Sequence, residues 1–319
     1  MKWLVTGGAG YIGAHTVHTL LRRGHDVIIL DDFSTGRKDF VPNGVDVFEG
    51  SLLDEKLVSE ALGVQGLDGV IHFAGFKFAG ESVLDPIRAY RQNVTGMINI
   101  LGGMVAAGVA NFIFSSSSAV YGDSGENQFV ESQEKKPMSP YGESKLIGEW
   151  LLANVETAHA IRSTSLRYFN VVGTREPGIY DTSPHGLFSL VFQALSEGKT
   201  PKIFGNDYST PDGTCVRDFI HVGDLADVHV LAAERISSGA FLEKAYNLGT
   251  GTGHSVAQVM RVIAEETGTD FVPQYESRRP GDPAIVVASG ELARRDLEWN
   301  PSTDMRDMVR SAWQSFCQS

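Results

Sequence analysis

The stretch KWLVTGGAGYIG, residues 2–13, decides the fold class. An apolar run that predicts a strand is followed by a glycine turn and then by a helical pattern. Gly8, Gly10 and Gly13 satisfy G-x-G-x-x-G, and Gly7, Gly10 and Gly13 satisfy G-x-x-G-x-x-G. Glycine permits the tight turn and lets backbone N–H groups approach a pyrophosphate, which the positive end of a helix dipole also favours. The motif in this context predicts a dinucleotide site.

Apolar runs and helical stretches alternate along the first half of the chain. Strands are expected at residues 26–32, 45–50, 69–75, 111–122 and 163–173, with helices between them. This alternation predicts an α/β fold, with a Rossmann-type doubly wound parallel sheet.

The alternation of predicted strands and helices ends after about residue 170, which predicts a second structural unit. We expect a cofactor domain over residues 1–170, with a returning segment at about 216–250. The rest, 171–215 and 251–319, is expected to form a smaller substrate-binding lobe.

Composition limits the class of protein. The formal net charge of −12 lacks the basic footprint of nucleic-acid binding. Cys215 and Cys317 form neither a disulfide framework nor a metal-type spacing, so no metal is expected. No signal-peptide pattern and no apolar run of about 18 residues occurs. We therefore expect a cytoplasmic protein with no membrane partner.

An acid, Asp31, lies at the end of the second predicted strand. Asp31 lies eighteen residues after Gly13, near the spacing of about 20 for a carboxylate that binds the adenosine ribose. Such a carboxylate repels a 2′-phosphate, which favours NAD over NADP. Arg37 and Lys38 nearby leave NADP open, and a polar strand end is the plainer interpretation of Asp31.

Residues 139–150, SPYGESKLIGEW, place a phenol near an ammonium. Tyr141 and Lys145 are four apart and share one face of a helix. A nearby ammonium lowers the phenol pKa from about 10, so that the phenol can take a proton from an alcohol. A surface helix with a lysine over it is the alternative. The serines of FSSSSAVYG, residues 114–122, do not suit a strand core, and are interpreted as a polar strand exit or as hydroxyls lining the cleft.

Motifs in a fixed order make a wider resemblance specific. TGGAGYIG, DDFSTG, HFAGFKFAGES, RQNVTG, FSSSSAVYG, SPYGESK, RYFNVVG, IFGNDYSTPDGTCVRDFIHVGDLA, YNLGTG and RRPGDP follow one another. The chain resembles the extended short-chain dehydrogenase/reductase superfamily, and within it the UDP-glucose 4-epimerases (UDP-galactose 4-epimerases). The resemblance covers residues 2 to about 299.

The resemblance implies a role for each matching residue. Tyr141 is the base, Lys145 binds the nicotinamide ribose and lowers the tyrosine pKa, and Ser117 holds the reacting hydroxyl. The NAD-binding residues it implies are Gly7, Gly10, Tyr11, Ile12, Gly13, Asp31, Asp32, Phe33, Ser34, Thr35, Gly36, Leu53, Asp54, Phe73, Ala74, Gly75, Lys77, Asn93, Ser115, Tyr141, Lys145 and Phe169. The substrate-binding residues it implies are Lys77, Ser117, Tyr141, Asn170, Phe204, Arg217, Arg279 and Asp282.

The implied reaction interconverts UDP-galactose and UDP-glucose by transient oxidation at sugar C4, with NAD regenerated in each cycle. The implied assembly is a homodimer, through the helices that bear residues 93–104 and 141–152. Two departures bear on the sugar contacts. SPHGLFSLVFQ, residues 183–193, stands where similar epimerases carry Asn-Asn-Leu, so that His185 is a candidate substitute. Val286 stands where some relatives have tyrosine, which leaves room for an N-acetyl group.

Other functions fit parts of the sequence. A nucleotide-sugar dehydratase needs a carboxylate beside the catalytic hydroxyl, and Ser117-Ser118-Ala119 has none. An NAD(P)-dependent nucleotide-sugar dehydrogenase or reductase shares the same trio. A non-catalytic NAD-sensing protein is a third class, which the intact trio disfavours.

Overall fold

A seven-stranded parallel sheet forms the larger part of the molecule. The computed structural model describes residues 1–123, 128–279 and 282–318. The strand order is β10-β6-β5-β4-β1-β2-β3, and each neighbouring pair is parallel. The strands are β1 (Lys2–Thr6), β2 (Asp26–Asp31), β3 (Asp46–Glu49), β4 (Gly69–His72), β5 (Asn111–Ser117), β6 (Arg162–Tyr168) and β10 (Ala245–Leu248). The predicted doubly wound sheet is confirmed. Its order reverses between β1 and β4, where ligands of such sheets bind.

Two hydrophobic cores lie on the two faces of this sheet. Within β1, Trp3 and Val5 enter one core and Leu4 enters the other, as the period of two requires. Helices α1 (Tyr11–Arg22) and α8 (Val222–Ser237) contribute to the first core, whereas α2 (Glu55–Leu62), α5 (Gly96–Ala107) and α6 (Pro140–Ala158) contribute to the second. Burial on both faces explains why the strands are apolar runs.

The helical stretch between β4 and β5 is divided. Segment α4 (Pro86–Tyr90) continues through a π-helical turn, Arg91–Thr95, into α5. A short helix, α3 (Ala79–Leu84), precedes them. The π turn carries Asn93, a buried residue beside the site described below.

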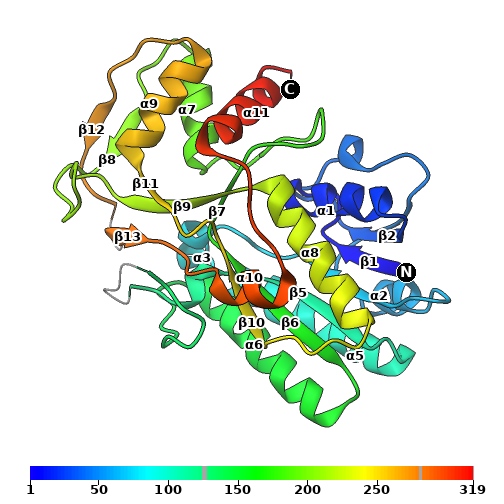
Figure 1. Ribbon diagram of the computed structural model, residues 1–319. Helices are drawn as coiled ribbons and strands as arrows, with labels where there is room; N and C mark the ends of the chain where they lie inside the picture. The colour runs from blue at the N-terminus through cyan, green and yellow to red at the C-terminus, as the bar shows by residue number, and fades with distance from the viewer. Residues whose placement is uncertain (124–127, 280–281, 319) are drawn as a thin grey trace.

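The smaller lobe lies at the upper left of Figure 1. It contains a sheet of β7 (Asn170–Val172), β9 (Val216–His221), β11 (Gly253–Ser255) and β13 (Ile285–Val286), and the pair β8 (Lys202–Phe204) with β12 (Gln274–Glu276). Helices α7 (Leu187–Ser196), α9 (Val256–Thr267) and α11 (Met305–Cys317) pack in a third core.

The chain crosses between the two parts more often than expected. In the returning segment, α8 and β10 join the large sheet domain, but β9 belongs to the sheet of the smaller lobe. Helix α10 (Glu291–Leu297) falls in the range expected for the lobe, yet it packs on β10 and α8. Ala293 and Leu297 are fully buried in the first core, which fixes α10 there.

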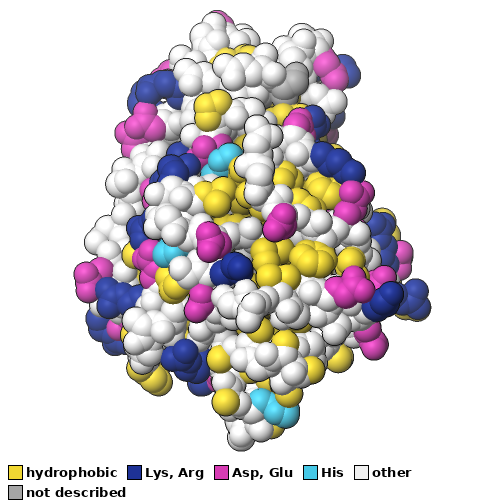
Figure 2. Space-filling model, turned by 90° about the vertical axis from the view of Figure 1, so that its right-hand side faces the viewer, with side chains coloured by type: hydrophobic (Ala, Val, Ile, Leu, Met, Phe, Trp, Pro, Cys, Tyr) yellow, Lys and Arg dark blue, Asp and Glu magenta, His cyan; other side chains and the backbone are white. Residues whose placement is uncertain are grey.

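The described residues contain no helix that is both long and apolar enough to cross a membrane. Within the same residues, no group of three or more His, Cys, Asp and Glu side chains is arranged to hold a metal ion. On the face in Figure 2, Lys and Arg lie among Asp and Glu and form no continuous basic patch.

Candidate active site

The glycine turn between β1 and α1 is closed so tightly that side chains do not fit. A Cβ on Gly13 would lie 2.1 Å from the Gly7 carbonyl oxygen. Gly7 has φ +70°, and its own Cβ would lie 2.7 Å from the backbone nitrogen of Ala74. Helix α1 begins at Tyr11, and its N-cap Gly10 offers no side chain to cap the first N–H groups. These groups are therefore left for an anion.

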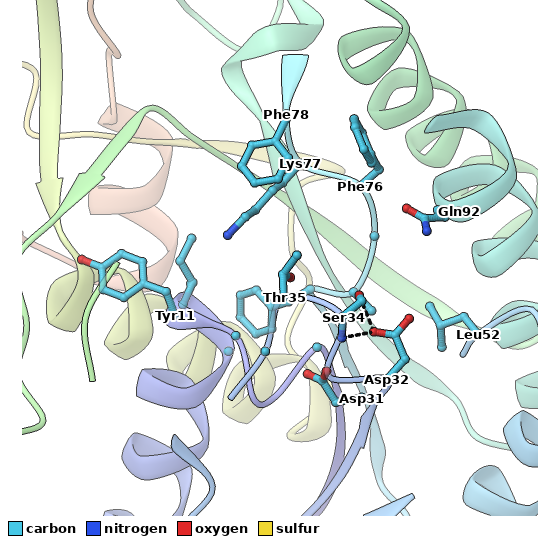
Figure 3. A pocket seen from close by; sticks show the side chains of 18 of the residues that line it. Tyr11, Asp31, Asp32, Ser34, Thr35, Leu52, Phe76, Lys77, Phe78 and Gln92 are labelled. Atoms are coloured by element: carbon cyan, nitrogen blue, oxygen red, sulfur yellow. Dashed lines mark hydrogen bonds between the residues drawn. The ribbon is translucent and has the colours of Figure 1, made fainter. Parts of the chain in front are cut away.

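A cavity of about 280 Å³ lies over this turn (Figure 3). Most residues implied for the cofactor line it: Gly7, Gly10, Tyr11, Ile12, Gly13, Asp31, Asp32, Ser34, Thr35, Gly36, Leu53, Phe73, Ala74, Gly75, Lys77, Tyr141 and Lys145. Others were not foreseen, including Ser51, Leu52, Phe76, Phe78, Gln92, Tyr168, Val171, Asp181 and Ser183. Asp181 and Ser183 come from the smaller lobe, so the cavity is walled by both parts of the chain.

Asp31 fastens the glycine turn to the end of β2. Its Oδ2 accepts from Ala9 N at 2.9 Å and its Oδ1 accepts from Phe33 N at 2.9 Å. Burial raises the pKa of this carboxyl, while the two hydrogen bonds oppose the rise. Each carboxylate oxygen has a second lone pair, so ribose hydroxyls can still donate to Asp31.

Both cations that left NADP open are paired with carboxylates. Arg37 binds Asp39 at 2.7 Å, and Lys38 binds Glu49 at 2.7 Å. Both pairs are exposed. Each cation therefore has a carboxylate partner in the protein alone.

Some implied cofactor residues do not line the cavity, namely Phe33, Asp54, Asn93, Ser115 and Phe169. Asp54 is the N-cap of α2, where its side chain accepts from Lys56 N and Leu57 N, both at 3.1 Å. Phe169 packs edge-on against Phe129 in a small core. These residues have structural roles in the protein alone.

Asn93 holds one wall of the cavity in place. Its Oδ1 accepts from Phe76 N at 2.6 Å, and its Nδ2 donates to Phe76 O at 3.0 Å and to Ser144 Oγ at 2.7 Å. The side chain therefore links the segment after β4 to α6. Ser144 also donates to Tyr141 O at 2.7 Å, so the link ends at the implied base.

The start of α6 sets the geometry of the implied catalytic pair. Ser139 is the N-cap and accepts from Gly142 N at 3.2 Å, and Pro140 occupies the first turn. Tyr141 and Lys145 then lie on one face, with the Lys145 Nζ 5.8 Å from the tyrosine ring centroid. Lys145 donates to the backbone oxygen of Ser115 at 2.9 Å.

The tyrosine pKa differs from the expectation. Burial raises the pKa of Tyr141, although a hydrogen bond with Ser117 lowers it in part. Burial also lowers the pKa of Lys145 to about 8. In the protein alone the ammonium thus does not bring the phenol below its ordinary pKa, because desolvation of the buried phenolate is the larger effect.

The expectation that the serines do not suit a strand core was wrong. Ser115, Ser116 and Ser117 are the buried last residues of β5. They fit because each hydroxyl has a partner. Ser115 bonds the Tyr168 hydroxyl at 2.8 Å, Ser116 donates to Glu149 at 2.7 Å, and Ser117 bonds Tyr141. Their alternation sends Ser115 and Ser117 to one face and Ser116 to the other.

The residues implied for the nucleotide of the substrate meet in pairs within the smaller lobe. Arg217 forms an ion pair and hydrogen bond with Asp282. The Arg279 guanidinium lies 4.2 Å from the ring centroid of Phe204. None of these four lines the cavity over the glycine turn, and neither does Asn170, which donates to Asp218 O at 3.1 Å.

The two departures from the family pattern occupy distinct places. His185 lies 2.7 Å from Glu81 and edge-on to Phe78, so it joins the smaller lobe to a residue of the cavity wall. Val286 packs against the small core that contains Phe169.

Comparison with known proteins identifies the family. The sequence model described as "NAD dependent epimerase/dehydratase family" matches residues 3–249. The UDP-glucose 4-epimerase of Corynebacterium glutamicum is 42% identical over 98% of this chain and 95% of the relative. The crystal structure of UDP-glucose-4-epimerase from Stenotrophomonas maltophila, with bound NAD and formylated UDP-arabinopyranose, has a TM-score of 0.94 at 35% identity, covering 100% of this chain and 98% of that chain. The UDP-Glc/GlcNAc 4-epimerase of Campylobacter jejuni has a TM-score of 0.87 at 32% identity, covering 100% and 99%.

These relatives span nearly the whole chain, and the family model covers the glycine turn, Tyr141 and Lys145 together. The resemblance drawn from the ordered motifs is therefore confirmed. The chain belongs to the NAD dependent epimerase/dehydratase family.

Proposed function

We propose that this protein is an NAD-dependent epimerase that interconverts UDP-galactose and UDP-glucose by transient oxidation at sugar C4. The observation that carries the proposal is the meeting of Ser117, Tyr141 and Lys145 beside a cavity built over the glycine turn. Relatives named UDP-glucose 4-epimerase support the substrate.

The cavity residues fit NAD. The uncapped first turn of α1 and the closed glycine turn offer N–H groups to a pyrophosphate. Asp31 retains lone pairs for the adenosine ribose. Tyr141 and Lys145 line the same cavity, and they would hold the nicotinamide end of the cofactor. When bound, NAD supplies the acceptor and donor of hydride at C4.

The protein's own groups then handle the proton and the nucleotide. Ser117 positions the 4-hydroxyl group, and Tyr141 removes its proton and, after the sugar has turned, returns a proton to the same oxygen. Lys145 provides positive charge near the phenol. This charge is needed because burial of Tyr141 raises the pKa of the phenol. Arg217 and Arg279 hold the diphosphate while the sugar turns, so that the 4-keto sugar is retained.

N-acetylated UDP-hexosamines are a second candidate substrate class. Val286 is small at a position beside Phe169, and the C. jejuni relative is named a UDP-Glc/GlcNAc 4-epimerase. Turnover of UDP-N-acetylglucosamine is expected in wild type, and Val286→Tyr should reduce it more than turnover of UDP-glucose. An equal loss with both sugars would contradict the assignment.

We also propose a homodimer in the cytoplasm. Support comes from exposed apolar side chains on neighbouring helices: Val83, Leu84, Ile87, Ile98, Val105 and Trp150. Light scattering should give twice the monomer mass, and Trp150→Glu should shift it toward the monomer. A monomeric wild type would refute the assembly.

The decisive experiment is incubation of the purified protein with UDP-galactose and no added cofactor. An epimerase converts UDP-galactose to UDP-glucose with only the NAD that it carries, whereas a net dehydrogenase or reductase stops without added cofactor, and a sensor binds without turnover. Tyr141→Phe should lose about 10²–10⁴-fold in rate. Tyr246→Phe, a buried phenol on the sheet edge, is the matched control and should retain activity. Absence of product from wild type, or full activity in Tyr141→Phe, would refute the proposal.

A further inference from the structure

The side chain of Tyr11 points away from the cofactor cavity although its backbone belongs to it. Tyr11 is the first residue of α1, and its phenol is buried. Figure 3 shows the hydroxyl directed away from Asp31, Ser34 and Thr35. It donates a hydrogen bond to the backbone oxygen of Gly173, 162 residues further along the chain. The cofactor turn is thereby tied to a remote segment.

Gly173 stands where the chain leaves β7 for the smaller lobe. Its φ is +92°, and a Cβ there would lie 2.3 Å from the His221 ring. The next residue, Thr174, contacts α11: its backbone N–H donates to Ser311 Oγ at 3.3 Å. Ser311 also lies 3.4 Å from His221 Nε2. The position of this segment is therefore fixed by the lobe on one side and by Tyr11 on the other.

His15, one turn after Tyr11 on α1, makes a second contact to the same segment. Its Nδ1 lies 2.8 Å from Tyr11 O, an acceptor, which places the ring proton on Nδ1. Nε2 then accepts from Arg175 N at 3.2 Å. Burial lowers the pKa of His15 to about 3, so the ring stays neutral and keeps this acceptor at physiological pH.

The segment joins strands that carry residues implied for the substrate. Strand β7 begins at Asn170 and pairs with β9, with Asn170 opposite Phe219 and Val172 opposite His221. Arg217 lies on β9, two residues before Phe219. A shift of Gly173 would move β7 and, through the pairing of β7 with Phe219–His221, the strand β9 that carries Arg217.

We propose that Tyr11 is a positioning residue that makes UDP-sugar binding in the smaller lobe depend on the NAD-bound conformation of the glycine turn. The inference builds on the proposed function. The backbone N–H of Tyr11 would donate to the pyrophosphate, and its phenol holds Gly173. Because both groups belong to one residue at a helix start, a change at the cofactor is carried to β7 and β9. Coupling between two binding sites is reciprocal, so UDP in turn stabilises the turn around NAD.

The test measures UDP binding to the NAD-loaded protein by calorimetry. Tyr11→Phe removes one oxygen and leaves the Gly173 oxygen without its donor. We expect the Kd for UDP to rise about tenfold, the KM for UDP-galactose to rise more than kcat falls, and the NAD content to stay at the wild-type level. Tyr246→Phe is the matched control. It also removes the hydroxyl of a buried tyrosine that bonds the backbone, here accepting from Glu243 N at 2.8 Å, and this bond lies away from the lobe.

Each outcome decides the proposal. A UDP Kd unchanged in Tyr11→Phe, an equal rise in Tyr246→Phe, or loss of NAD from Tyr11→Phe would overturn it. If Tyr11→Phe does not fold, hydrogen exchange on wild type provides the readout. UDP should then slow exchange at residues 11–15 more than at residues 245–248, and equal exchange would overturn the proposal. Since binding is measured without turnover, a wild type that fails to epimerise would refute the proposed reaction and leave this inference standing.

Discussion

The closed glycine turn gives a contrast between two alanine substitutions in the same loop. In Gly13→Ala the new Cβ would lie 2.1 Å from the Gly7 oxygen, whereas real Cβ atoms stay at least 3.0 Å away, so the two must separate by about 0.9 Å. The obstructing atom is backbone and cannot rotate away. In Gly10→Ala the Cβ would lie 3.3 Å from the same oxygen, which a shift of a few tenths of an ångström relieves.

The expected magnitude follows from this displacement. Overpacking that moves backbone costs about 1–3 kcal/mol, which corresponds to a loss of about 5- to 150-fold if it falls on the affinity for NAD. Gly10→Ala should remain within about threefold of wild type, because its contact is relieved by small adjustments. The distance of each new Cβ from the Gly7 carbonyl oxygen therefore predicts a larger loss in Gly13→Ala than in Gly10→Ala.

The assay compares the NAD released on denaturing each purified protein, and the Kd for NAD after reloading, with the melting temperature recorded in parallel. Gly13→Ala should lose NAD, lose thermal stability, or both. Wild-type NAD content and melting temperature in Gly13→Ala would refute the reasoning. A larger effect in Gly10→Ala than in Gly13→Ala would refute it equally.

Three further substitutions or conditions test other parts of the structure. Asn93→Ala leaves Phe76 N–H without its acceptor, so it should lower the free energy of unfolding by about 1–3 kcal/mol in urea titration and reduce NAD content. Glu149→Gln weakens the buried pair with Arg167, at 2.5 Å, and should cost about 3–5 kcal/mol by the same titration. His72 is held neutral, with burial lowering its pKa from 6.5 to about 3, whereas the unfolded chain takes up a proton below pH 6.5. Its stabilising contribution is therefore complete above pH 6.5 and is lost as pH falls toward 3, so the melting temperature should fall over this range, and less steeply in His72→Gln.

Controls for these variants come from less buried counterparts. Glu49→Gln breaks the exposed pair with Lys38 and should change stability by less than about 1 kcal/mol. Asn99→Ala removes one hydrogen bond, to Leu52 O at 2.9 Å, and should cost less than Asn93→Ala. Equal losses in the buried and exposed pairs, or acid stability identical in wild type and His72→Gln, would contradict the assigned causes.

Sequence reasoning succeeded where a constraint is local. The glycine turn needs particular backbone angles over a few residues, so its motif is written in consecutive positions. The shared face of Tyr141 and Lys145 follows from helix periodicity once Ser139 and Pro140 fix the start of α6. The parallel sheet follows from apolar runs that are buried on both faces.

Sequence reasoning was incomplete where distant segments meet. Asp181 and Ser183 reach the cavity because the smaller lobe docks there, which no neighbouring residue signals. Asp54 was assigned to the cofactor by resemblance, although an Asp before a helical run is also a capping signal, and the structure uses it as a cap. The pKa of Tyr141 depends on its burial, which a spacing of four does not report.

The packing of α1 against α8 has a consequence for the way the protein is made. Val17 and Leu20 on α1 are covered in a core shared with Leu225 and Val228 on α8. Helix α1 ends at residue 22 and α8 begins at residue 222, so 199 residues lie between them. At about 5–20 residues per second a ribosome takes about 10–40 s to supply the missing helix. During that interval the apolar side of the nascent cofactor helix is open to water and to chaperones. A fragment ending at residue 170 would keep every glycine of the turn and still leave that side uncovered.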